Sequence, residues 1–290
     1  MGDLYAVITA VCWSSAVILF DISTKNFTAI QLNVLKNFIG VFGFILTIVL
    51  FSIPSPNFSQ QDIFTLALSG FLGILIADGL FLESLRRLGS GISAVVSTVY
   101  TPTVFIIAFI LFNETIKPQS YIGGSLVLVG ITISVFHYPN TIKKKDLYIG
   151  ILFGLMANIL TAYSVLIIKP IMKNNPVVYV ALYRFSVGLF FGIIINLVKS
   201  RSQTVIQKFK QGLTNQYVIF GALLGTYLSV IFWLAGYKYT LAGRAAIYNQ
   251  LSTVFIIILA RIFLKEPMTS KKIIGVSLAI FGAMIVGVSK

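Results

Sequence analysis

Residues 28–52 read TAIQLNVLKNFIGVFGFILTIVLFS and contain one charged side chain, Lys36. A helix needs about 20 mostly apolar residues to cross the hydrocarbon core of a bilayer, and this stretch is long enough. Runs of the same kind follow one another along the whole chain. The sequence therefore predicts an all-α membrane protein.

The apolar runs predict ten transmembrane helices. Their approximate ranges are 3–21, 28–52, 63–84, 91–112, 119–136, 147–168, 176–198, 215–237, 243–264 and 272–289. Turn-forming residues such as Pro54-Ser55-Pro56-Asn57 separate the runs. Most connections are short, so neighbouring helices should run antiparallel, and the longest, 199–214, is polar and basic.

The composition agrees with this class. Hydrophobic residues make up 57% and charged residues 10% of the 290 residues, whereas soluble domains carry about 25% charged residues. The mean hydropathy is +0.95. In a soluble protein, 22 Lys and Arg against 8 Asp and Glu would indicate nucleic-acid binding. Here the basic residues lie mostly in short connections, where topology signals and lipid-phosphate contacts are found. We expect a multi-pass protein of the cell membrane, surrounded by the lipid bilayer, with no nucleic-acid partner.

Catalytic and metal chemistry have few candidate residues. The chain has one cysteine, Cys12, and one histidine, His137, which lies at the end of an apolar run. These residues cannot form a disulfide framework or a metal site of several His and Cys ligands. An intramembrane enzyme would need paired catalytic groups, which the sequence does not offer. We therefore expect no enzyme, no metal and no cofactor.

The second part of the chain repeats the first. With a shift of 152 positions, 13 residues of the stretch 82–133 are identical to their counterparts. The matching residues of the first copy are Leu82, Gly91, Ala94, Thr101, Ile106, Ala108, Ile110, Glu114, Gly123, Ser125, Leu126, Gly130 and Ile133. The glycines and the match of Glu114 with Glu266 carry more weight than the aliphatic matches. The front parts align more weakly: Asp3 matches Asp146, and Lys36 matches Arg184.

This comparison predicts two five-helix repeats, residues 1–140 and 141–290. Because five is an odd number, the second repeat enters the membrane from the opposite side. Inverted repeats are typical of secondary carriers, in which two halves move about a site near the midplane of the membrane.

The motifs at the end of each repeat have a familiar pattern. The first copy is Leu85 to Ala94, then Pro102 within a helix and Asn113-Glu114; the second is Tyr237 to Ala246, then Lys265-Glu266-Pro267. In these residues the chain resembles the drug/metabolite transporter superfamily, in its ten-helix EamA-type branch. Val254 stands where that family often has proline in the second half, so the kink expected at Pro102 has no proline counterpart there.

The resemblance implies a secondary active transporter that moves a small metabolite, such as an amino acid, by alternating access, with export as the implied direction. Two alternatives stay open. One is a multidrug or organic-cation exporter, and the other is a lipid-handling membrane protein.

Three charged residues stand out because they lie away from the ends of the predicted helices: Asp78, Lys36 and Arg184. A charge near the bilayer centre costs about 2.5–3.5 kcal/mol on insertion scales, so it usually faces the interior of the bundle. Asp78 is a candidate contact for a substrate amine, or a proton-titrating group that would make protons the coupling ion. The alternative is a structural ion pair with Lys36. Lys36 and Arg184 are candidates to hold a substrate carboxylate, unless they extend to an interface.

Polar residues open the predicted helices four and nine, and we expect the substrate cavity beside them. The candidates are Tyr100 in helix four and Tyr248, Asn249 and Gln250 in helix nine. Pro102 would kink helix four and free a carbonyl, which survives in a membrane only beside a partner or a wet cavity. The alternative is hydrogen bonding between helices. Trp13, in the middle of the first helix, is the strongest aromatic candidate.

Two features concern assembly and orientation. Gly275, Ala279, Ala283 and Gly287 form a ridge of small residues that permits close packing, within a monomer or in a homodimer. Thirteen basic residues follow odd-numbered helices and six lie on the other side. The positive-inside rule then places both termini outside, whereas the family resemblance implies termini in the cytosol.

Overall fold

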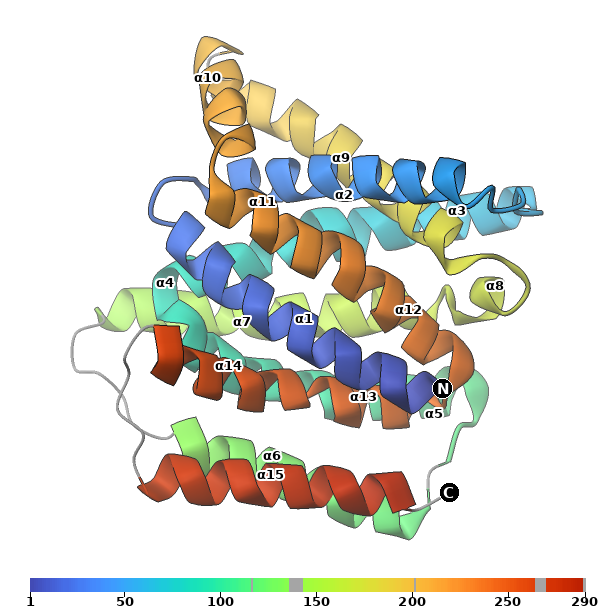
Figure 1. Ribbon diagram of the computed structural model, residues 1–290, viewed down its shortest axis with the longest axis vertical. Helices are drawn as coiled ribbons and strands as arrows, with labels where there is room; N and C mark the ends of the chain where they lie inside the picture. Colours follow the sequence, from blue (N-terminus) through green and yellow to red (C-terminus); the bar gives the residue numbers. More distant parts are fainter. Residues whose placement is uncertain (116, 136–142, 201, 264–269, 289–290) are drawn as a thin grey trace.

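The computed structural model describes residues 1–115, 117–135, 143–200, 202–263 and 270–288 (Figure 1). Every regular element in these ranges is helical. Seven helical segments are long and apolar enough to cross a membrane: Gly2–Ser23, Ala29–Leu50, Gln60–Ala94, Lys144–Leu166, Val177–Lys199, Gln216–Tyr239 and Ala242–Phe263. Shorter apolar helices cover Ser97–Phe112 and Ile273–Gly282. The predicted all-α membrane class is therefore confirmed.

The helices follow one another with few long connections. In chain order they are α1 (Gly2–Ser23), α2 (Ala29–Leu50), α3 (Gln60–Ser69), η1 (Gly70–Ala77), α4 (Asp78–Val96), η2 (Ser97–Val99), α5 (Tyr100–Phe112), α6 (Pro118–Val135), α7 (Lys144–Leu166), α8 (Lys169–Asn174), α9 (Val177–Lys199), α10 (Ser202–Leu213), α11 (Gln216–Ala222), η3 (Leu223–Leu228), α12 (Ser229–Tyr239), α13 (Ala242–Asn249), α14 (Leu251–Phe263) and α15 (Ser270–Val288).

Several boundaries follow from local sequence chemistry. Thr28 and Gln31 form a capping box at the start of α2, and Ser59 and Asp62 form another at the start of α3. Asn215 accepts hydrogen bonds from the first backbone N–H groups of α11. Such caps satisfy donors that have no partner within the helix. They lie where apolar runs begin, so the expected spans agree with the helices to within a few residues.

Two boundaries differ from the expectation. The predicted helices three and four are joined in α4, which is bent at Gly89 with φ 72° and ψ 172°. Only glycine adopts that backbone conformation readily, so the chain turns there without a separate loop. The connection 199–214, described from the sequence only as polar and basic, contains the amphipathic helix α10, whose Phe209 packs against Phe38 of α2.

The long helices lie side by side, and both chain termini lie at the same end of the molecule (Figure 1). The helices α6 and α15 pair with each other along one edge. A Cβ added at Gly282 would lie 2.5 Å from the carbonyl oxygen of Gly123, so the two backbones approach too closely for a side chain. Gly282 therefore serves packing within the chain, whereas the role of the predicted ridge of small residues stays a prediction. The side-chain surroundings of Ala279 and Ala283 lie outside the described set.

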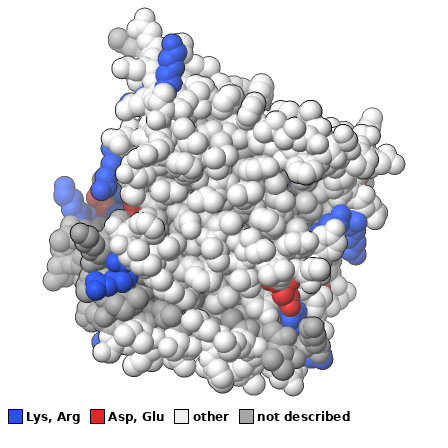
Figure 2. Space-filling model, viewed as in Figure 1, with Lys and Arg blue, Asp and Glu red and all other residues white. Residues whose placement is uncertain are grey.

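The surface and interior have the polarity expected in lipid. Charged side chains gather at opposite ends of the face shown in Figure 2, and the broad surface between them carries none. Large apolar side chains are exposed on the outside of the helices, for example Phe42 of α2 and Phe190 of α9. Polar residues such as Asn33 and Asn37 are instead buried inside. Such a distribution suits a protein surrounded by hydrocarbon.

Two of the long helices contain a π-helical segment, η1 and η3. A π-helical turn shifts the hydrogen-bonding register and often marks a functional site. Two further helices are interrupted near their starts. The 3₁₀ turn η2 precedes α5, and a single turn at Gln250 separates α13 from α14. These irregular segments all meet at one place in the interior.

Candidate functional site

A cavity of about 150 Å³ lies in the interior of the bundle. Its lining residues are Thr9, Ala10, Trp13, Lys36, Gly73, Ile74, Asp78, Phe81, Ser97, Tyr100, Ala157, Asn158, Thr161, Ser164, Arg184, Phe185, Gly225, Thr226, Ser229, Val230, Trp233, Asn249, Gln250 and Ser252. Both π-helices and both interrupted helices contribute to this wall. The edge pair α6 and α15 contributes no residue to it. An engineered cavity of this volume holds benzene, so the space suits a ligand of roughly six to ten non-hydrogen atoms.

Lys36 and Asp78 form an ion pair in the cavity wall. The Nζ atom of Lys36 lies 2.6 Å from Oδ2 of Asp78 and also donates to Oδ1 of Asn37 at 2.9 Å. Lys36 is only 3% exposed. The structural ion pair weighed in the sequence is therefore present, and it faces the cavity rather than an interface.

The π-helix η1 places this pair. Asn33 donates its side-chain amide to the carbonyl oxygens of Ile74 and Leu75 at 3.0 and 3.3 Å. Because Lys36 lies one turn after Asn33 and Asp78 one turn after Ile74, the two contacts form parallel links from α2 to the end of η1 and the start of α4. The register of the π-helix thus sets the position of the Asp78 carboxylate.

Arg184 has no such partner. It is 0% exposed, and its Nη2 atom donates to Oγ of Ser164 at 3.3 Å. The guanidinium lies over the ring of Trp233 at 5.7 Å. The Nε and Nη1 atoms have no hydrogen-bond partner, and Arg184 makes no ion pair with any residue that the structure describes. Asp78 acts on it only through longer-range Coulomb attraction.

Two glycines of η1 make room for Arg184. A Cβ at Gly70 would lie 2.4 Å from the backbone oxygen of Arg184. A Cβ at Gly73 would lie 2.3 Å from Oγ of Ser164 and 3.1 Å from Nη2 of Arg184. Since real Cβ atoms do not approach so closely, larger residues would displace the guanidinium or its partner.

The two interrupted helices are joined beside the cavity. Gln250 donates from Nε2 to the carbonyl oxygen of Ser97 at 3.3 Å, and Thr101 donates to the carbonyl oxygen of Ala246 at 3.3 Å. Hydrogen bonding between these helices, weighed as an alternative in the sequence, is therefore observed for Gln250. Asn249 differs: Tyr237 approaches it, but neither of its amide atoms completes a hydrogen bond.

Pro102 lies in the first turn of α5, directly after the 3₁₀ turn. The helix is therefore irregular just before the proline, in the 3₁₀ turn Ser97–Val99. The hydroxyl of Thr103 donates a hydrogen bond to the carbonyl oxygen of Val99 at 2.8 Å. The other half has Val254 instead, yet its helix is also interrupted, at Gln250. The missing proline does not remove the interruption of helix nine.

The cavity brings together most of the residues singled out in the sequence. Asp78, Lys36, Trp13, Tyr100, Arg184, Asn249 and Gln250 all line it. Tyr248 does not: it is buried in a separate apolar cluster with Ile247 and Leu251. Consecutive residues of a helix point about 100° apart, and here this step turns Tyr248 from the cavity towards that cluster.

Some wall residues were missed in the sequence. Asn158, Thr161 and Ser164 of α7 recur every three residues, a spacing that places polar groups on one face of an apolar helix. This spacing is present in the sequence and could have indicated a polar face on α7. Among the other aromatic residues of the apolar runs, Trp233 lines the cavity, whereas Tyr163 and Tyr183 are exposed.

Ion pairs close the end of the bundle where the termini lie. Asp3 of α1 accepts from Nη2 of Arg244 at 2.7 Å and from Oγ1 of Thr240 at 3.1 Å. Glu114 pairs with Lys169 and accepts from the backbone N–H of Ala242 at 2.8 Å. These contacts join segments before residue 140 to segments after it. Glu266 and His137 lie outside the described residues.

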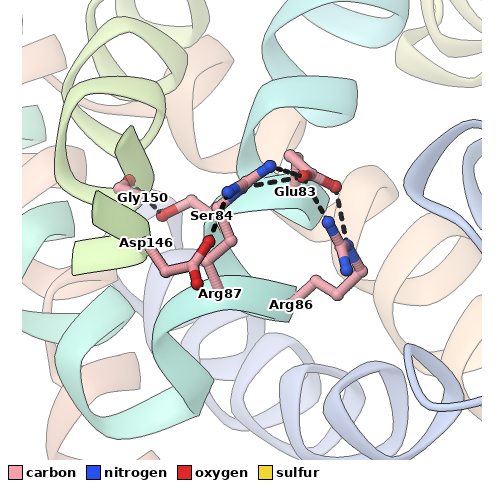
Figure 3. A network of polar contacts seen from close by, with 6 residues as sticks. All are labelled: Glu83, Ser84, Arg86, Arg87, Asp146 and Gly150. Atoms are coloured by element: carbon pink, nitrogen blue, oxygen red, sulfur yellow. Dashed lines mark hydrogen bonds and ion pairs between the residues drawn. The ribbon is translucent and has the colours of Figure 1, made fainter. Parts of the chain in front are cut away.

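A second network lies at the opposite end, where α7 begins (Figure 3). Glu83 accepts from both Arg86 and Arg87, and Arg87 reaches across to Asp146 of α7 at 2.6 Å. Ser84 donates to the carbonyl oxygen of Gly150 at 2.8 Å. The cavity therefore lies between two sets of polar contacts, one at each end.

Comparisons with known proteins agree with a transporter. Residues 1–136 and 148–288 each match the model of the EamA-like transporter family. An uncharacterized transporter of Archaeoglobus fulgidus is 22% identical over 282 residues, which are 97% of this chain and 96% of the relative. An uncharacterized transporter of Synechocystis is 22% identical over 233 residues, 78% of this chain and 66% of the relative.

Two other matches concern architecture. An uncharacterized protein of Methanocaldococcus jannaschii is 27% identical over 144 residues, which are 48% of this chain but 97% of that protein. A solved crystal structure aligns with 99% of this chain and 98% of its own, with a TM-score of 0.77 at 14% identity, which shows a shared fold. With family matches over both parts of a helical, lipid-facing chain, the protein is a multi-pass integral membrane protein that belongs to the EamA-like transporter family.

Proposed function

We propose that the protein is a secondary active carrier that moves a small carboxylate-bearing metabolite, such as an amino acid, by alternating access. The observation that carries this proposal is Arg184: a buried guanidinium with two unpartnered nitrogens in the wall of an interior, ligand-sized cavity. An unpaired buried charge is costly, so such a group is kept where a ligand supplies the countercharge. The chain belongs to a transporter family, and a transported ligand binds and dissociates in each cycle.

The chain crosses the membrane ten times in this proposal. Seven long spans and two shorter apolar helices support nine crossings, and α6, packed along α15, supplies the tenth. Both termini at one end agree with an even number of crossings (Figure 1).

Residues 1–140 and 141–290 form two inverted repeats. The family model matches twice, and one relative corresponds to about half of this chain. The π-helices η1 and η3 fall at corresponding places, as do the interruptions at η2 and Gln250. Asp3 and Asp146, which the sequence comparison aligns, each pair with an arginine of the other repeat, and they do so at opposite ends.

These two ion pairs provide a mechanism for alternating access. Opening one end requires the Arg87–Asp146 contact to break while the Asp3–Arg244 contact holds, and opening the other end requires the reverse. Both ion pairs are formed in this structure, so neither end has parted. Export is the direction proposed, from the family resemblance.

Cross-linking tests the mechanism. In a chain with Cys12→Ala, cysteines replacing Arg87 and Asp146, or Asp3 and Arg244, are joined by a short bifunctional thiol reagent. Either cross-link should stop repeated turnover, and cleavage of the reagent should restore it. Full flux with either end locked would contradict alternating access.

Flux tests the carrier itself. Purified protein in liposomes is assayed with a panel of labelled small carboxylates and amino acids, with and without a pH gradient. No flux of any compound would overturn the proposal. Protons are the proposed coupling ion, carried by Asp78, so Asp78→Asn should abolish any effect of the pH gradient. Unchanged coupling would remove Asp78 from that role.

The alternatives are separated in the same liposomes. An organic-cation exporter would need an acid free to bind the cation, but Asp78 is engaged by Lys36. A lipid-handling protein would move fluorescent lipids between leaflets, whereas the carrier should not.

A further inference from the structure

The cavity wall has an uneven charge balance. Among its lining residues Lys36 and Arg184 are positive and Asp78 is negative, so the described wall carries one excess positive charge. Lys36 and Asp78 neutralise each other at 2.6 Å. The excess therefore resides on Arg184.

From this balance we infer that the substrate carries one net negative charge, and that its carboxylate binds at Arg184. The inference rests on the proposed carrier function and narrows it. A monoanion brings the occupied cavity to neutrality, whereas a zwitterion leaves the excess charge unchanged and a cation doubles it. Charges inside a low-dielectric site interact far more strongly than in water, so this difference decides which ligand is retained.

The surroundings of Arg184 fit a carboxylate. Its free Nε and Nη1 atoms can donate charge-assisted hydrogen bonds, and guanidinium groups match carboxylates in geometry. Oγ1 of Thr226 and the amide of Asn249, also without partners, lie in the same wall and can bind further polar atoms of the ligand. A second negative charge on the ligand would leave the cavity negative, which disfavours dianions such as phosphate esters.

The rest of the wall fits a short apolar body. Ile74, Phe81, Phe185 and Val230 line the cavity beside the charged groups. At about 150 Å³ the space admits a small organic acid rather than a large amphipathic molecule. The substrate class is thus a small organic monocarboxylate, for example a 2-hydroxy acid.

The chain contains its own reporter for a binding test. Both of its tryptophans, Trp13 and Trp233, line the cavity. Tryptophan fluorescence of the purified full-length protein in detergent therefore reports ligand entry, and in Trp13→Phe the signal comes from Trp233 beside Arg184 alone. Binding in detergent also avoids the passive permeation of weak acids through liposomes.

The ligands differ in charge but hardly in shape. The larger set is 2-hydroxy-4-methylpentanoate, leucine and leucinamide, which carry one negative charge, no net charge and one positive charge; lactate, alanine and alaninamide form the smaller set. We expect the anion of at least one set to bind about ten-fold or more tightly than its zwitterion, with still weaker binding of the cation.

Two variants locate the effect. Arg184→Gln removes the excess charge and should remove the preference for the anion. The double variant Lys36→Gln, Asp78→Asn keeps the net charge of the wall and should keep the order anion, zwitterion, cation. Thermal unfolding without ligand checks that each variant is folded.

The outcomes are distinct. Tighter binding of leucine, alanine or the amides than of the anions overturns the inference, while the carrier proposal then depends on the flux panel alone. An anion preference that survives Arg184→Gln in a folded variant also overturns it. Failure of both anions to bind overturns it as well, since charge balance should bring at least one into the cavity. Absence of flux for every compound would instead overturn the carrier proposal.

Discussion

Lys36 and Arg184 occupy matching places in the two parts of the sequence, but their surroundings differ. Lys36 is neutralised by Asp78 and hydrogen-bonded to Asn37. Arg184 donates one hydrogen bond to Ser164 and lies over the ring of Trp233. The sequence alignment places Val230 opposite Asp78, so the second part lacks the acid that the first part has. In the proposed carrier the scaffold repeats while the charge pattern at its centre does not, and we propose that this asymmetry creates the substrate site.

The largest effect should come from breaking the neutral pair. Lys36→Met leaves the partly buried Asp78 carboxylate without a partner; breaking a fully buried pair costs about 3–5 kcal/mol of stability, which sets the upper limit here. The double variant Lys36→Met, Asp78→Leu should recover most of that loss, because a well-packed apolar pair replaces an ion pair at little cost. Unfolding in detergent measures both; equal loss in the single and double variants would show that the pair is not the cause.

Arg184→Gln should lower the affinity for the anionic substrate about 100-fold, because truncating one partner of a buried charge pair costs roughly 2–5 kcal/mol. Arg184→Lys keeps the charge but not the planar fork, so its affinity should be intermediate. Titration of tryptophan fluorescence gives both values. Unchanged affinity in Arg184→Gln would place the substrate elsewhere.

Gly73→Ala should weaken binding about ten-fold, a loss of about 1.4 kcal/mol, because the added Cβ would displace Ser164 and the guanidinium of Arg184. Gly79→Ala, six residues further along the chain, is the matched control. There an added Cβ has room, because its nearest atom is Nδ2 of Asn33 at 3.9 Å. Similar losses in the two variants would mean that close packing at Gly73 does not position Arg184.

The smallest expected effect is on stability, and it distinguishes Arg184 from Lys36 without any substrate. Without substrate, Arg184→Met should leave stability unchanged or raise it by about 1 kcal/mol, since an uncompensated buried charge is removed. The sign is opposite to that for Lys36→Met. If both variants are destabilised alike, Arg184 has a structural partner and the asymmetry between the two residues fails.

Much of this architecture could be predicted from the apolar runs. Their length indicated membrane helices because a bilayer offers the backbone no other hydrogen-bond partners. The turn at Gly89 and the helix α10 were not foreseen, since the first depends on one backbone angle and the second on packing by Phe209 against Phe38.

The candidate site could be predicted in part. Charges and polar clusters inside apolar runs indicated Asp78, Arg184 and Asn249. The ion pair of Asp78 with Lys36 was one of two readings of the sequence. The choice between them could not be predicted, because it depends on the register of the π-helix η1. Tyr248 shows that a neighbour in sequence need not share a site. It lies next to Asn249 in the chain but packs in a separate apolar cluster instead of lining the cavity.

The most direct test of a carrier with its substrate site at Arg184 is flux through the intact protein. Counterflow of labelled 2-hydroxy-4-methylpentanoate and lactate is measured in liposomes containing the native chain, Arg184→Gln, or no protein. Accumulation of at least one anion by the native chain and background flux with Arg184→Gln is the predicted result. Equal accumulation by the native chain and a folded Arg184→Gln variant, or background flux throughout, would contradict it.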